Sequence, residues 1–407
     1  MDDAYRREWA QVLATTVRVA GDLDIAEECV QEAFVSALAA WDADGVPANT
    51  GAWLTTVAKR KALDHLRRAS TARSKLPLLI EPEVVDPEDE GDEVSVIPDD
   101  RLRLVFTCCH PALSPETQVA LTLRLVCGLP TANIAQTFLV SESTMAARIT
   151  RGKKKIQVAR IPFVMPQPED LEERLDAVLT VIHLFFTAGH TAASGNELVD
   201  REVVVRAIEL GRQLTALMPG HPEAQGLLAL MLLTDARRAS RVDAEGELVL
   251  LAEQDRSLWD QDAITEGLAL ERGAMAQDRA AGRFALQAAI AGVHASAPSA
   301  SMTDWPAIVS LYDQLLVVWP TPVVALNRAA AIAMADGPAA GLEALDDAAS
   351  SPALRGYHYV PAARADLLRQ LGRDAEAAEE YRQALLMVGN DVERRFLQRR
   401  LAEVTQF

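Results

Sequence analysis

Arginines, lysines and small polar residues lie along one segment at a spacing that suits nucleic-acid binding. Residues 129–156 read LPTANIAQTFLVSESTMAARITRGKKKI. This pattern predicts two short helices joined by a tight turn, the first beginning at Thr131 or Asn133 and the second at Ser141. Ser141 suits the N-cap position, and Glu142 follows it in the first turn, where the helix dipole favours an anion. The segment is therefore a candidate helix-turn-helix.

The second helix of this pair would carry the groups that contact DNA. We expect Met145, Ala146 and Ile149 to face inward, which leaves the polar and basic side chains outside. Small polar groups and arginines can then read base edges, while the lysines behind them bind phosphates. The predicted DNA-contacting residues are Ser141, Ser143, Thr144, Ala147, Arg148, Arg151, Lys153, Lys154 and Lys155. The alternative is an ordinary helical hairpin with a solvated basic face, since the turn lacks the usual glycine.

A second basic cluster lies on an earlier helix that would begin at Asn49 or Thr50. Between Lys59 and Lys75 the chain has seven cations against Asp64 alone. Such cations can neutralise phosphates, while a nearby aromatic ring or amide can lie against an unstacked base. The residues assigned to this contact are Asn49, Trp53, Lys59, Arg60, Lys61, Arg67 and Arg68. Two separate basic helices imply two separate contacts with nucleic acid.

The helix before this cluster is predicted to be acidic on one side. Asp22 can cap it, and its apolar stripe comprises Leu23, Ala26, Val30, Ala33, Phe34, Leu38 and Trp41. The opposite side comprises Asp24, Glu27, Glu28, Gln31 and Glu32. Carboxylates that recur once per helical turn suit a basic partner helix, and the alternative is a solvated face.

Length and charge divide the chain into parts. At 407 residues it is long enough for two or three domains, and its net charge is −18. Ten of the acids lie within residues 81–100, a stretch without lysine or arginine in which prolines recur. That composition cannot bury a core, so we expect an acidic linker at 76–100 between helical domains at 1–75 and 101–160.

A third domain is predicted for residues 169–407, where helical patterns follow one another without strand-like alternation. Residues 365–386 have the spacing of a tetratricopeptide (TPR) unit, in which small residues let paired helices approach closely. The segments 214–224 and 315–325 share a form in which a proline-flanked turn joins two helices. We predict about twelve helices stacked in pairs, and the alternative is an irregular bundle with one accidental match. The fold class is all-α.

Other chemistries are not indicated. Cys108, Cys109 and Cys127 lack zinc-ligand spacing, and adjacent helical cysteines point about 100° apart, so buried packing is favoured over a metal site. Four cysteines in a chain of this length indicate a reducing compartment. Without a phosphate-binding loop, dinucleotide fingerprint or nucleophile elbow, we expect no catalytic residue, no cofactor and no enzyme activity. No apolar run is long enough to span a membrane, which favours a cytoplasmic protein.

The order of acidic-faced helix, basic helix, acidic linker and helix-turn-helix resembles the extracytoplasmic-function (ECF) sigma factors of bacterial RNA polymerase. Residues 22–41 are similar to the polymerase-binding segment of the sigma-two domain, and residues 53–68 to its minus-ten-reading helix. Residues 129–156 are similar to the minus-thirty-five reader of the sigma-four domain. Three matching motifs in the right order are far more specific than any one of them.

Residues from Leu171 onward resemble the TPR-like domain fused to one subgroup of this family. One departure is FFTAGH at 185–190, where a segment closer to FNEGY is expected. In that subgroup the fused domain is thought to regulate the factor. We expect it to clasp the sigma domains rather than to shield their basic helices, because salt weakens electrostatic shielding.

The resemblance implies an alternative sigma factor with several partners. These are core RNA polymerase, contacted at its clamp coiled coil and flap, promoter DNA, and a regulatory protein or small ligand at the C-terminal domain. A membrane partner is not implied. The alternative is a one-component helix-turn-helix regulator that senses a ligand or peptide through its helical repeats.

Overall fold

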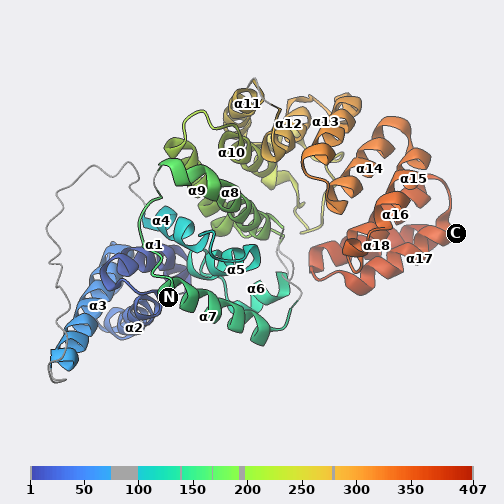
Figure 1. Ribbon diagram of the computed structural model, residues 1–407. Coiled ribbons are helices and arrows are strands. Elements are labelled where there is room, and N and C mark those ends of the chain that lie inside the picture. The colour runs from blue at the N-terminus through green and yellow to red at the C-terminus, as the bar shows by residue number, and fades with distance from the viewer. Residues whose placement is uncertain are drawn as a thin grey trace. The chain divides into compact units, whose positions relative to one another are not determined.

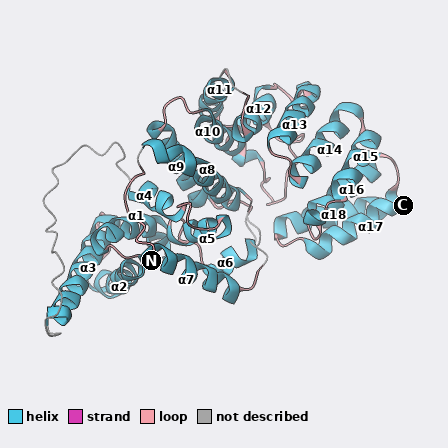
Figure 2. Cartoon of the chain, in the orientation of Figure 1, coloured by secondary structure: helices cyan, strands magenta, loops and turns pink. Residues whose placement is uncertain are grey.

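The computed structural model describes residues 2–74, 100–137, 140–166, 168–191, 198–276 and 280–405. Within these ranges every regular element is a helix, and the β-pairing is confined to one isolated bridge between Val242 and Leu248 (Figure 2). The all-α prediction is confirmed. The chain divides into two compact units, residues 1–185 and 186–407 (Figure 1).

The first unit contains seven helices and most of an eighth. They are α1 (Asp2–Ala20), α2 (Leu23–Asp44), α3 (Thr50–Ser74), α4 (Asp100–Cys108), α5 (Pro115–Leu125), α6 (Thr131–Thr137), α7 (Glu142–Val158) and α8 (Pro168–His190), of which α8 runs across the unit boundary. Helix α1 packs against α2 and α3 and also against α4, so the helices on both sides of the predicted linker meet in this unit. Residues 76–99 of that linker lie outside the described residues.

The helix starts predicted from capping residues are confirmed. The Asp22 carboxylate accepts the backbone N–H groups of Asp24 at 2.8 Å and Ile25 at 3.0 Å, which fixes the first turn of α2. The predicted apolar stripe of α2 is wrong at Leu38, which is 56% exposed. Ala37, fully buried, takes the inward position instead, because it lies about one turn after Ala33 and Phe34.

Three cysteines and a glycine lie among the buried residues from α4 to α7. None of Cys108, Cys109 and Cys127 forms a disulfide bond, and each is at most 5% exposed, which confirms the buried-packing interpretation. Burial raises the pKa of Cys109 to about 12. Where α7 crosses α5, a Cβ atom on Gly152 would lie 2.6 Å from Thr117 Cγ2, so this crossing requires glycine.

The second unit continues as a row of helices to the end of the chain (Figure 1). Its α-helices are α9 (Arg201–Leu217), α10 (Pro222–Asp235), α11 (Gln261–Met275), α12 (Arg283–Ser296), α13 (Trp305–Val318), α14 (Pro322–Asp336), α15 (Pro338–Ala349), α16 (Tyr359–Gln370), α17 (Asp374–Met387) and α18 (Asp391–Thr405). Short 3₁₀ turns lie at Arg238–Ser240, Arg256–Leu258, Ala300–Met302 and Pro352–Leu354. The described residues from 168 onward thus contain eleven α-helices, against the twelve expected.

The repeat-like segments form paired helices as their turn chemistry predicts. Pro222 and Pro322 each occupy the first turn of a helix, α10 and α14, after the short turns that end α9 and α13. The TPR-like segment is the pair α16 and α17, joined at Gly372, whose φ of +73° suits glycine. Tyr381 of α17 is 1% exposed and packs with small residues of both helices.

Candidate nucleic-acid interface

Most of the predicted DNA-contacting side chains of α7 are exposed. Met145 and Ile149 face the protein interior as expected, at 0% and 6% exposure. Ala146 is exposed, which contradicts the prediction, because it lies one position and about 100° further round the helix than Met145. The exposed candidates are Ser141, Ser143, Thr144, Ala147, Arg151, Lys154 and Lys155, and Arg148 is half-buried.

Local contacts fix the first turns of α7. The Ser141 hydroxyl accepts the backbone N–H of Thr144 at 3.2 Å, which confirms its role as N-cap. The Arg151 guanidinium donates from Nε to the Ala147 carbonyl at 3.1 Å and so lies along the helix.

The aromatic and amide candidates of the minus-ten contact have structural partners. The Asn49 side chain accepts the backbone N–H of Ala52 at 2.9 Å and caps α3. The Trp53 ring lies edge-on to Trp41, with centroids 5.6 Å apart. Trp53 remains half-buried rather than covered. Whether it contacts a base stays a prediction.

The cations of α3 differ in their exposure and in their ion pairs. Arg60 and Arg68 are exposed, and Lys59 is half-buried. Lys61 pairs with Glu32 of α2 at 3.0 Å, and Arg67 lies 3.5 Å from Asp64 on its own helix. Exposed pairs of this kind contribute about 0–1 kcal/mol, so phosphates can compete for these cations.

The acidic side of α2 is exposed except at one residue. Glu28, Gln31 and Glu32 are exposed, and the side chain of Asp24 keeps 65% of its surface. Glu27 differs from the expectation of a solvent-facing row, because only 7% of it is exposed. Cations from the helix-turn-helix domain cover it.

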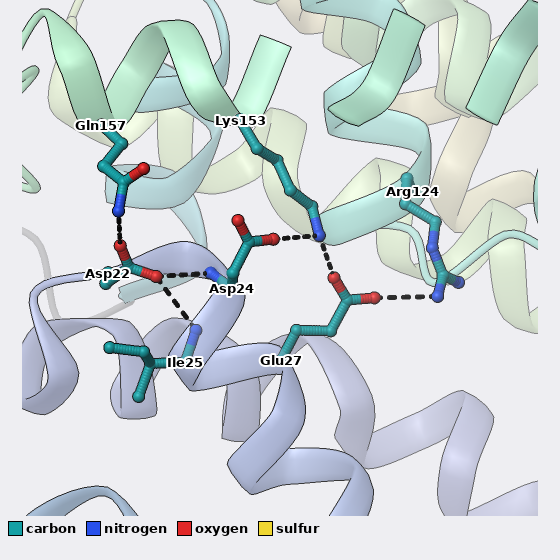
Figure 3. Close-up of polar contacts among 7 residues, drawn as sticks. All are labelled: Asp22, Asp24, Ile25, Glu27, Arg124, Lys153 and Gln157. Carbon is teal, nitrogen blue, oxygen red and sulfur yellow. Dashed lines mark hydrogen bonds and ion pairs between the residues drawn. The ribbon is translucent and has the colours of Figure 1, made fainter. Parts of the chain in front are cut away.

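Figure 3 shows that Glu27 accepts from two cations at once. Its Oε1 accepts from Nη2 of Arg124, on α5, at 2.8 Å. Its Oε2 accepts from Nζ of Lys153, on α7, and the same ammonium donates to Asp24 at 3.0 Å. Gln157, one turn after Lys153, donates to the Asp22 carboxylate at 2.8 Å. We call these six residues the α2–α7 latch: Asp22, Asp24, Glu27, Arg124, Lys153 and Gln157.

The centre of this latch is a buried ion pair. The side chains of Glu27 and Lys153 are 9% and 13% exposed. Burial alone would lower the pKa of Lys153, but the hydrogen bonds and negative charges of Glu27 and Asp24 outweigh it and raise that pKa. Lys153 therefore stays protonated at neutral pH and holds the carboxylates of α2 against α7.

Sequence reasoning missed the latch. It assigned Lys153 to a DNA phosphate and both carboxylates to the polymerase, whereas in this structure the three side chains bind one another (Figure 3). Arg124 was not singled out at all. Glu27 is separated by 97 residues from Arg124 and by 126 from Lys153, and no local pattern indicates such a pairing.

The site contains nothing that resembles a catalytic or metal centre within the described ranges. No group of three or more His, Cys, Asp or Glu side chains there is placed to hold a metal ion. Among the same residues, no helix combines the length and apolarity needed to cross a membrane. The chemistry available is that of charged and polar surfaces.

Comparison with known proteins shows which family the helices of the first unit match. Region 2 of the sigma-70 proteins matches residues 4–71, and region 4 matches residues 103–156. The probable ECF RNA polymerase sigma factor SigI of Mycobacterium tuberculosis (strain ATCC 25618 / H37Rv) is 33% identical over 162 residues, which are 39% of this chain and 54% of that protein. The chain belongs to the ECF sigma factors. Helices α1 to α3 are thus its region 2, and α4 to α7 its region 4.

Other comparisons bear on this sigma factor as a whole. SigJ of the same Mycobacterium strain, an ECF RNA polymerase sigma factor, is 30% identical over 148 residues, 36% of this chain and 46% of SigJ. An uncharacterized protein of Rhizobium meliloti (strain 1021) is 41% identical over 394 residues, 96% of this chain and 92% of that protein. Residues 174–275 match a family of unknown function (DUF6596). No solved structure matches the chain.

Proposed function

We propose that this chain is an alternative sigma factor that binds core RNA polymerase and directs promoter-specific initiation in the cytoplasm. The observation that carries the proposal is the presence of regions 2 and 4 in one chain, each with an exposed cationic helix. In this proposal Glu28, Gln31 and Glu32 of α2 bind the polymerase clamp, α3 reads the minus-ten element and α7 reads the minus-thirty-five element. Initiation needs no catalytic residue of the factor, because the polymerase supplies the chemistry.

The α2–α7 latch gives this function a closed starting state. Asp24 and Glu27 are proposed polymerase contacts, and Lys153 is a proposed phosphate contact, yet all three are paired with one another. The same groups cannot bind both within the chain and outside it. Polymerase binding to α2 therefore separates α7 from α2, and this opening frees Lys153 for DNA.

The C-terminal unit regulates this step in our proposal. Its helices from residue 186 onward form a compact unit of their own, as a separable regulatory domain requires. We favour a clasp that sets the separation of regions 2 and 4 over an acidic body that shields them. A clasp makes the C-terminal unit necessary for transcription, whereas a shield makes it inhibitory.

Polymerase dependence of DNA binding tests the proposal. A labelled promoter fragment is titrated with the chain alone and with the chain plus core polymerase, at physiological salt. A sigma factor whose DNA-reading helices are held in the closed state should give a sequence-specific complex only with core polymerase. Tight sequence-specific binding by the chain alone would favour a one-component regulator instead.

A further inference from the structure

The C-terminal unit contains a cavity that the sigma functions do not use. It has a volume of about 450 Å³ and is lined by residues of α14, α16, α17 and α18 together with Leu248 and Leu250. A cavity of this size is within the range that holds a drug-sized small molecule rather than an extended chain.

A short hairpin closes one side of the cavity. Residues 241–250 double back through the bridge between Val242 and Leu248, with Gly246 at the tip in a left-handed conformation. Arg395 of α18 holds this tip, because its Nε lies 2.7 Å from Glu247 and its Nη2 donates to the Gly246 carbonyl at 2.8 Å. A segment between α10 and α11 is thereby tied to the last helix of the chain.

The walls of the cavity combine aromatic rings with carboxylates. Tyr357 and Tyr359 lie edge-to-face with centroids 5.2 Å apart. The side chain of Glu393, 13% exposed, accepts from the Tyr359 hydroxyl and lies 3.4 Å from Nε2 of His358. Asp366 lines the same space, but its carboxylate already accepts from Arg369 at 2.7 Å and from Gln370 at 2.7 Å. Among the described lining residues Glu393 and Asp366 are the acids, and lysine and arginine are absent from the lining.

One buried polar group of the wall is incompletely bonded. Tyr381 is 1% exposed and lines the cavity, and its hydroxyl lies near the Arg369 guanidinium without a hydrogen bond of standard geometry. A buried hydroxyl that lacks a partner is costly to the protein alone, and a ligand group could satisfy it. The cavity therefore offers aromatic faces, the carboxylate of Glu393 and a buried tyrosine hydroxyl.

We propose that this cavity binds a small organic cation, a protonated amine carried on an apolar body. The ammonium group would lie against the tyrosine faces and pair with Glu393, and the body would fill the space beside Leu248 and Leu250. Ligand binding would tighten the hairpin against α18. Its effect on transcription rests on the proposed sigma function, whereas the binding itself does not.

Calorimetry and thermal unfolding of the full-length protein test this proposal with three probes of one shape. Phenethylammonium, 2-phenylethanol and phenylacetate present a positive, a neutral and a negative group on the same ring. We expect the ammonium ion to bind at least about tenfold more tightly than the alcohol, with the carboxylate weakest. Glu393→Gln should weaken ammonium binding by about tenfold, whereas Glu379→Gln, which removes an exposed acid of α17 outside the cavity, should not.

A second variant keeps the test decisive if Glu393→Gln unfolds. Ala330→Phe adds a ring at an exposed position of the cavity wall and leaves every charge in place. It should abolish binding of phenethylammonium. The proposal is overturned if no probe binds, if phenylacetate binds as tightly as phenethylammonium, or if binding survives Ala330→Phe. A chain that binds the ammonium ion but supports no promoter-specific transcription would remove the proposed function and leave this site intact.

Discussion

Replacing Lys153 with methionine should open the α2–α7 latch and strengthen binding to core polymerase. The substitution removes the ammonium that bridges Asp24 and Glu27 but keeps a side chain of similar reach. In the ion pair between Lys153 and Asp24, the Asp24 side chain is 65% exposed, so this pair stabilises the closed form by at most about 1 kcal/mol. The buried contact with Glu27 is worth more, although Arg124 still neutralises that carboxylate.

We therefore take about 2 kcal/mol as the loss of closed-state stability in Lys153→Met, below the 3–5 kcal/mol that breaking a fully buried pair costs. A shift of that size changes the ratio of closed to open forms by a factor of about 30. Since polymerase binds the open form, its apparent dissociation constant should fall by up to the same factor. The assay is a titration of the labelled factor with core polymerase.

Lys154→Met is the matched control, because Lys154 is exposed and lies outside the latch. It removes the same charge one residue further along and should leave polymerase affinity unchanged. Equal affinities for the two variants, or weaker binding by Lys153→Met, would refute the reasoning. The second result would mean that Lys153 itself contacts the polymerase.

Labels on α2 and α7 would report the opening directly. The four native cysteines are buried, so cysteines introduced at the exposed positions Asp42 and Val158 can be labelled selectively. Energy transfer between the labels should fall in Lys153→Met and remain unchanged in Lys154→Met. Loss of transfer on adding core polymerase to the unsubstituted latch would show the opening step itself.

Four further predictions concern pH, DNA reading, packing and regulation. The pKa of Lys153 is raised above 10.5, so the charge of Lys153 stabilises the closed form fully below that pH and ceases to do so as the pH rises through the raised pKa. Energy transfer between the labels on α2 and α7 should therefore fall over that pH range, and Lys153→Met should not show this pH-dependent fall. Arg148→Ala or Arg151→Ala should cost about 1–3 kcal/mol of binding and relax base preference, whereas Lys155→Ala should lower the salt slope by about one, as promoter titrations would show. Gly152→Ala should destabilise region 4 by about 1–3 kcal/mol in urea unfolding, because the added methyl group has no space. Truncation at Met165 should reduce promoter-dependent transcription, and stronger transcription by the truncated chain would show that the C-terminal unit inhibits.

The features that local chemistry determines could be predicted from the sequence. Asp22, Asn49 and Ser141 begin or cap helices because a short polar side chain can accept the first free N–H groups, whatever surrounds it. Pro222 and Pro322 start helices for an equally local reason. Helix positions, the all-α class and the two exposed cationic helices follow from such rules.

Features that depend on distant segments could not be predicted in this way. Glu27 looks like any acid on a polar helix face until Arg124 and Lys153 are brought to it from region 4. The C-terminal cavity likewise depends on Glu247 meeting Arg395, 148 residues later. Neither pairing leaves a periodic or compositional signal, because each residue type is ordinary at its own position.

The central claim is tested most directly by transcription in vitro from genomic DNA, with core polymerase alone and with core polymerase plus this protein, followed by mapping of the RNA start sites. The account predicts a limited set of defined starts that require the protein and share sequence elements near minus ten and minus thirty-five. Charge reversal at Glu28 should abolish these starts without unfolding the chain. Start sites that are unchanged by adding the protein would contradict the account.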